Sequence, residues 1–159
     1  MIMVSACLLG INCRYDGESR PDRTLLSSDV IQRCVPVCPE QLGGLSTPRA
    51  PSEIIEGEGA DVLEGKSKII SSSGVDVTDC FIRGANEVLR IAECMNIRTA
   101  IMKEKSPSCG VCHIKRKEYV EQGSGVTTAL LMRHGIRVIS SDMIREALTP
   151  GTDLLRTER

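Results

Sequence analysis

The sequence predicts an α/β fold: a three-layer, Rossmann-like sheet, mostly parallel, with helices on both faces. Short apolar runs of strand character alternate along the chain with segments of helical period. Strands that alternate with helices favour a parallel sheet covered on both faces. The length of 159 residues fits one globular domain with its own core. We assign residues 1–148 to this α/β domain and residues 149–159 to a polar C-terminal tail.

The first third of the chain is predicted to hold two strands and one helix. Residues 2–6 form a short apolar strand, and residues 34–38 form the second. Between them a helix covers about residues 28–33, with Ser28 or Asp29 at its first turn. The stretch 39–65 is rich in glycine and proline and is predicted to be irregular. A connection this long is typical of a functional loop.

The remaining elements follow from hydrophobic period and from turn residues. A helix capped by Thr78 or Asp79 continues to Met95, because apolar residues recur along it at helical spacing. Residues 97–103 form the third strand and 136–139 the fourth. A helix that starts at Ser124 or Thr127 precedes the fourth strand and ends before Gly135. Residues 140–148 form a last short helix.

Composition narrows the classes of partner. The net charge is -1, and aromatic residues make up only 2% of the chain, too few to stack many exposed bases. A single-strand nucleic-acid binder is therefore disfavoured, and the basic run 115–117 is predicted to be a solvated surface turn. We find no secretory signal and no apolar run long enough to cross a bilayer, so we expect a cytoplasmic protein with no membrane partner. Its eight cysteines are then reduced thiols.

Three of these cysteines each follow a predicted strand: Cys7, Cys38 and Cys109. The carboxyl ends of parallel strands meet at one edge of a sheet, where ligands are usually held, so these thiols are predicted to share one crevice. Thiolates select zinc, copper(I) or iron-sulfur clusters. Three ligands from three loops would leave one coordination position open, as catalysis requires.

The spacing permits a second arrangement. Cys34-x3-Cys38 and Cys109-x2-Cys112 match the spacing of structural zinc sites, which predicts a non-enzymatic zinc-binding module. The residues alone leave both arrangements open.

Several motifs in one order carry a resemblance to a known family. They are Ser5-Ala6-Cys7-Leu8-Leu9-Gly10, Arg14-Tyr15-Asp16-Gly17, Cys38-Pro39-Glu40, Gly43-Gly44-Leu45, Pro48-Arg49-Ala50-Pro51-Ser52-Glu53, Asp76-Val77-Thr78, Lys103-Glu104-Lys105-Ser106-Pro107-Ser108-Cys109-Gly110 and Gly125-Val126-Thr127. In these motifs the chain resembles the thiouracil desulfidase (TudS-like) family over roughly residues 1–140. An ordered set of motifs is far more specific than any one of them.

The resemblance implies a 4Fe-4S cluster held by Cys7, Cys38 and Cys109, with the fourth iron free for the sulfur of a thiocarbonyl substrate. It implies a hydrolase-type desulfidase that releases sulfide from thiolated pyrimidines such as 2-thiouracil. It also points to Glu40 and Ser106 as the acid-base pair, and we hold Ser108 as the second choice for the hydroxyl. A cluster-bearing sulfur carrier in tRNA thiolation is a further alternative, so thiolated tRNA stays a possible partner.

Substrate contacts are predicted for Asp16, Arg49 and Glu53, although Arg49 and Glu53 could instead pair with each other. The chain departs from the family pattern after Gly110, where it carries Val111 to Tyr119 in place of a run of small residues. There Cys112 could act as a fourth ligand or bind zinc, and His113 could be a ligand, a proton donor or a surface residue.

Overall fold

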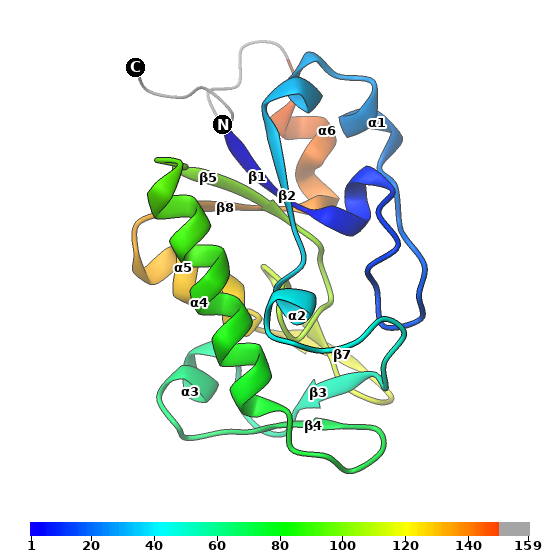
Figure 1. The fold of residues 1–159 in the computed structure, drawn as a ribbon, viewed down its shortest axis with the longest axis vertical. Coiled ribbons are helices and arrows are strands. Elements are labelled where there is room, and N and C mark those ends of the chain that lie inside the picture. The colour runs from blue at the N-terminus through cyan, green and yellow to red at the C-terminus, as the bar shows by residue number, and fades with distance from the viewer. Residues whose placement is uncertain (150–159) are drawn as a thin grey trace.

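A four-stranded parallel sheet forms the centre of the computed structural model, which describes residues 1–149 (Figure 1). Its strands are β1 (Ile2–Ser5), β2 (Cys34–Val37), β5 (Thr99–Met102) and β8 (Arg137–Ser140), in the order β2-β1-β5-β8. All three pairings are parallel. The predicted α/β fold is confirmed. Residues 150–159, most of the predicted tail, lie outside the described residues.

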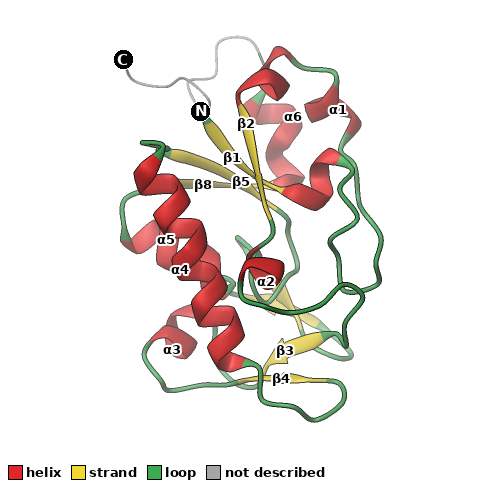
Figure 2. Ribbon diagram, in the orientation of Figure 1, coloured by secondary structure: helices red, strands yellow, loops and turns green. Residues whose placement is uncertain are grey.

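Helices cover both faces of the sheet (Figure 2). On one face α4 (Thr78–Cys94) and α5 (Val126–Arg133) pack against alternate strand residues such as Met3 and Met102. On the other face α1 (Arg23–Leu26) and α6 (Ile144–Ala147) pack against the residues between them, such as Val4 and Ile101. β1 and β5 are buried along their whole length, as expected for parallel strands covered on both sides.

Three of the predicted helices differ in detail. The segment predicted as a helix over 28–33 is a 3-10 turn, η2 (Asp29–Arg33), because it is too short to extend before β2 begins. The α-helix in this region is α1, whose first turn is capped by the Asp22 carboxylate accepting the Leu25 N–H. At the start of α4 the Thr78 N–H donates to Asp76, so neither Thr78 nor Asp79 is the cap. The last predicted helix is split into η3 (Ser141–Met143) and α6.

The stretch 39–65 is not one irregular loop. It contains α2 (Pro39–Leu42), β3 (Ser52–Ile54) and α3 (Gly59–Leu63), and a 3-10 turn, η1 (Ala6–Leu9), follows β1. β3 pairs antiparallel with β4 (Ile69–Ser71), and β6 (His113–Lys115) pairs antiparallel with β7 (Val120–Gln122). Most of these short elements mix polar with apolar residues and lack the apolar runs that indicated the strands of the central sheet, which is why the sequence does not reveal them.

The prediction that the basic run 115–117 is a solvated surface turn is wrong for Arg116, which is buried. It is 8% exposed, and its guanidinium donates to the carbonyls of Ile54 and Gly57 and pairs with Glu121. Arg116 therefore fastens the β6–β7 hairpin to β3.

A direct backbone contact sets the position of α2. Gly43 lies against Cys80 on α4, and Gly84 lies against Pro39 on α2. A Cβ at Gly84 would stand 1.9 Å from the Pro39 carbonyl oxygen, so only glycine allows this approach. α2 begins directly after Cys38, and this contact therefore also places Cys38 and the next residues. No helix within residues 1–149 has both the length and the apolar character to span a bilayer.

Candidate functional site

A cavity of about 400 Å³ opens at the carboxyl ends of the parallel strands. Loops that follow β1, β2 and β5 form its base. Its walls are formed by β3, by Ile70 of β4 and Ser72 after it, and by the end of β6 with the residues that follow. β1 lies between β2 and β5, so the strand that follows β1 in the sheet, β2, pairs on one side of it and the later β5 pairs on the other. The strand order therefore reverses at β1. This is the point in an open α/β sheet where ligands bind.

The structure brings all three predicted ligand cysteines to this cavity. Cys7 comes from η1 after β1, Cys38 directly follows β2, and Cys109 lies in the loop after β5. Cys7 and Cys109 are buried, and Cys38 is partly exposed. Burial raises the pKa of the Cys109 thiol to about 12.

A fourth thiol, Cys13, lies among them, and sequence analysis gave it no role. It lines the same cavity and packs in one cluster with Cys7 and Cys38. The interaction with Cys13 lowers the pKa of Cys7, against the opposing effect of burial. The neighbouring Cys38 lowers the pKa of Cys13, but the interaction with Cys7 and burial outweigh this effect and raise the pKa to about 11. The only indication of a role for Cys13 in the sequence was its position between two of the family motifs, residues 5–10 and 14–17.

The loop that carries Cys109 is held by a serine turn. The Ser106 hydroxyl oxygen accepts the N–H groups of Ser108 and Cys109 at 3.1 and 3.0 Å, and Ser106 lines the cavity. The Ser108 hydroxyl points elsewhere: it is fully buried, lies 2.9 Å from the Thr127 hydroxyl, and is not part of the cavity lining. Of the two predicted serines, only Ser106 faces the cavity.

Glu104 fixes the far end of the same loop, a role that sequence analysis missed. It is 3% exposed, and one carboxylate oxygen accepts the N–H groups of three successive residues, while the other accepts the Ser140 hydroxyl. The three donors are Val111, Cys112 and His113. Burial alone would raise the pKa of Glu104, but these hydrogen bonds hold it below its ordinary value.

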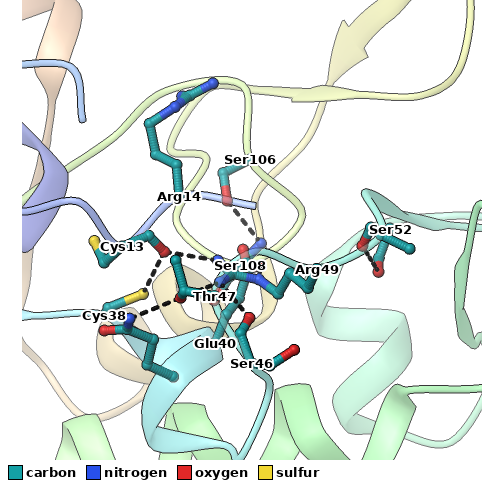
Figure 3. A network of polar contacts seen from close by, with 12 residues as sticks. Cys13, Arg14, Cys38, Glu40, Ser46, Thr47, Arg49, Ser52, Ser106 and Ser108 are labelled. Carbon is teal, nitrogen blue, oxygen red and sulfur yellow. Dashed lines mark hydrogen bonds and ion pairs between the residues drawn. The ribbon is translucent and has the colours of Figure 1, made fainter. Parts of the chain in front are cut away.

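Glu40 lies in the first turn of α2, lines the cavity and forms an ion pair with Arg49 (Figure 3). The Arg49 Nε lies 2.6 Å from the Glu40 carboxylate, and both side chains are largely buried. Arg49 therefore pairs with Glu40, and the pairing with Glu53 that the sequence allowed does not form.

The other two predicted substrate residues are placed differently from each other. Glu53 on β3 lines the cavity, and its carboxylate accepts the Lys117 N–H at 2.8 Å. Asp16 does not line the cavity. Its carboxylate forms an ion pair with Arg14 at 3.0 Å, and Arg14 does line the cavity.

The four-thiolate zinc site does not form. Cys34 is the first residue of β2 and Cys38 directly follows its last, so their Cα atoms lie about 13 Å apart at the rise of an extended strand. Cys112 is exposed, and neither it nor His113 lines the cavity. Within residues 1–149, no three His, Cys, Asp or Glu side chains converge on one ion position.

An iron-sulfur cluster makes a different demand on the protein. Each cysteine binds its own iron atom, so the sulfurs surround a volume and need not meet at a point. Three thiols from three loops around one cavity are a soft donor set of this type. The donors present therefore fit a cluster better than a single zinc ion.

Comparison with known proteins gives consistent results. A family model described as 2-thiouracil desulfurase matches residues 2–143. The chain is 45% identical over 151 residues to the uncharacterized protein YbbK of Bacillus subtilis (strain 168), a match that covers 93% of this chain and all of that protein. It is also similar to the solved structure of TudS, described as a 4Fe-4S-dependent thiouracil desulfidase, with a TM-score of 0.78 and 43% identity. That match covers 91% of this chain and 93% of the other.

Proposed function

Because the chain belongs to the 2-thiouracil desulfurase family, we propose that it is a 4Fe-4S-dependent desulfidase that converts thiolated pyrimidines such as 2-thiouracil to the oxo base and sulfide. The observation that carries the proposal is that Cys7, Cys38 and Cys109 line one cavity from three adjacent strand ends. The similar structure of TudS, itself described as 4Fe-4S-dependent, supports it.

In this proposal Cys7, Cys38 and Cys109 hold the cluster as thiolates. When bound by three cysteines, such a cluster supplies a soft Lewis acid with one open position for the thiocarbonyl sulfur. The rest of the cavity, about 400 Å³ in all, receives the ring of the substrate.

The protein must also manage protons, because replacing C=S by C=O consumes one water and releases hydrogen sulfide. Glu40 lines the cavity and takes a proton from the attacking water as general base. The Ser106 oxygen already accepts two N–H groups, so its remaining bond is donation of its own proton, which we assign to the leaving sulfur. Ser108 is the weaker choice, since its hydroxyl bonds to Thr127.

Substrate contacts are assigned to the walls of the cavity. Glu53 offers a carboxylate that accepts an N–H of the pyrimidine ring. Asp16 acts through Arg14, whose guanidinium it holds beside the cavity.

The test is turnover by anaerobically reconstituted protein. Wild-type protein with bound iron and sulfide is incubated with 2-thiouracil, and uracil and free sulfide are quantified by chromatography and by a colorimetric assay. We expect equal amounts of both products. Cys7→Ala, Cys38→Ala and Cys109→Ala should each lose iron and turnover, whereas the matched control Cys94→Ala, at an exposed cysteine of α4, should keep both.

Two results would contradict the proposal. Iron-loaded protein that releases no sulfide from thiolated bases or nucleosides is not a desulfidase of this class. Sulfur that disappears from the substrate and stays on the protein, without free sulfide, would instead indicate a sulfur carrier.

A further inference from the structure

We propose that Arg49 is a positioning residue that fixes the Glu40 carboxylate relative to the sulfur ligands and does not itself bind the substrate. The inference rests on the proposed function, in which Glu40 is the general base. It replaces the substrate contact that sequence analysis predicted for Arg49, and it follows from the hydrogen bonds of the guanidinium.

The donors of Arg49 are almost fully used inside the protein. Nε donates to Glu40 at 2.6 Å, and Nη1 donates to the Ser46 carbonyl and the Thr47 hydroxyl, both at 3.1 Å. Nη2 donates to the Cys13 carbonyl at 3.0 Å (Figure 3). A guanidinium has five N–H donors, and these bonds occupy four of them. The side chain is only 7% exposed, so little of it is left for a substrate.

The Cys13 carbonyl connects Arg49 to a proposed cluster ligand. The same oxygen accepts the Arg49 Nη2 at 3.0 Å and the Cys38 thiol at 3.6 Å. Glu40 follows Cys38 by two residues on the chain. The Cys38 bond needs the thiol proton and is given up when Cys38 binds the cluster as a thiolate, whereas the two Arg49 bonds, to Glu40 and to the Cys13 carbonyl, need no such proton and are kept. Arg49 therefore fastens the Glu40 carboxylate to the loop that carries Cys13, while the chain itself joins Glu40 to the proposed ligand Cys38.

A base that activates water beside an open metal position must be held in place, because small displacements of a catalytic group are costly. α2 has only four residues, and a glutamate side chain has several rotatable bonds. The bond from Arg49 holds the Glu40 carboxylate in place, which the short helix alone does not do. The backbone N–H of Arg49 donates to the Tyr15 carbonyl at 2.9 Å, which anchors Arg49 itself to the loop that carries Cys13.

The experiment compares Arg49→Met and Arg49→Lys with wild type and with Arg90→Met. Arg90 is a matched control, because it pairs with Glu87 on the exposed face of α4. We expect kcat to fall at least 30-fold in Arg49→Met while KM and the iron content change less than threefold. Arg49→Lys should recover little of the lost kcat, since the lysine ammonium is a point charge and cannot reproduce the hydrogen bonds of the planar guanidinium. In a Glu40→Gln background, Arg49→Met should lower the residual rate by no more than twofold.

Opposite results would overturn the proposal. A tenfold rise in KM with kcat preserved, or losses that multiply in the double variant, would mean that Arg49 contacts the substrate. A crystal structure of cluster-free Arg49→Met provides a readout independent of turnover. It should show the Glu40 carboxylate displaced from its wild-type position with the three cysteines in place, and an unmoved carboxylate would refute a positioning role. If wild-type protein binds the cluster and releases no sulfide, the proposed function fails, and this crystallographic comparison still decides the role of Arg49.

Discussion

The hydroxyl oxygens of Ser108 and Thr127 lie 2.9 Å apart, and both side chains are fully excluded from solvent. Two further bonds join the same segments: the Thr127 N–H donates to the Ser108 carbonyl, and the Thr128 hydroxyl donates to the Cys109 carbonyl, each at 2.9 Å. The loop that carries Cys109 is thus fastened to the first turn of α5.

Thr127→Val should destabilise the protein, although the two side chains have almost the same shape. The change leaves the Ser108 hydroxyl buried without its partner, which costs about 1–3 kcal/mol. Ser108→Ala should cost a similar amount. Urea denaturation of both variants and of the double variant measures the coupling. We expect the double variant to lose clearly less than the two single losses together, and strict additivity would show that the two hydroxyls do not interact.

Ser106→Ala should lower the rate of sulfide release by about 100-fold or more, the range of a lost acid-base group. The substitution also removes the acceptor for the N–H groups of Ser108 and Cys109, so iron content must be measured alongside the rate. The control is Ser27→Ala, at an exposed serine bonded only within its own turn. A variant that keeps its iron and also its full rate would exclude Ser106 from proton transfer.

Glu104→Gln should destabilise the protein by about 1.5–3 kcal/mol at neutral pH, because its charged acceptor serves three backbone donors and a serine. The folded-state pKa lies below the ordinary value of 4.5, so this contribution is fully present above pH 4.5. It is lost as the pH falls through the lower, folded-state pKa. Denaturation curves at pH 7, 5, 4 and 3 should therefore show the gap between wild type and variant closing in acid. A gap that stays constant down to pH 3 would contradict the assignment.

Gly84→Ala should destabilise the protein, the opposite of the usual effect in a helix. Replacing glycine by alanine inside a helix normally stabilises it by about 0.5–1 kcal/mol. Here the added Cβ would meet the Pro39 carbonyl, and overpacking of this kind costs about 1–3 kcal/mol. Iron loading should fall with it, since α2 and Cys38 must move. Asn86→Ala, at an exposed position of the same helix, is the control and should leave thermal stability and iron content nearly unchanged.

Arg116→Met should loosen the β6–β7 hairpin, because it leaves the Ile54 and Gly57 carbonyls without their donor, at a cost of about 1–3 kcal/mol. Hydrogen exchange over residues 113–122 should become faster while exchange in β1 and β5 stays slow. Lys117→Met is the matched control: Lys117 is the next residue, exposed and only distantly paired with Glu53, and its loss should change stability by less than about 0.5 kcal/mol. Equal effects of the two variants would contradict the role given to Arg116.

The sequence was most informative where a strand meets a loop. The apolar runs before Cys7, Cys38 and Cys109 predicted three parallel strands, and parallel strands must end at one edge. Their cysteines had to lie near each other for that reason. The helical period that ends near Met95 likewise predicted α4, because seventeen residues give enough turns to reveal a buried face.

Other features depend on tertiary contacts that no local pattern reveals. Arg116 and Ile114 alternate inward along the hairpin strand, but in the sequence Arg116 stands between two lysines and resembles a surface charge. The only partner that the sequence suggested for Arg49 was Glu53, four residues away, whereas the structure pairs it with Glu40, nine residues earlier in the chain. Cys13 had no assignment because its contacts with Cys7 and Cys38 arise only when the loop folds over the sheet edge.

The cavity has two parts of separate origin. Its sulfur-bearing base belongs to the parallel sheet, whereas much of its wall comes from two small antiparallel pairs, with residues such as Glu53, Ile70 and Lys117. Those pairs stand outside the central sheet and are joined to each other through Arg116. The wall can consequently diverge during evolution while the base stays constant. Relatives that share the three cysteines should differ in which sulfur compound they accept mainly through changes in these two pairs.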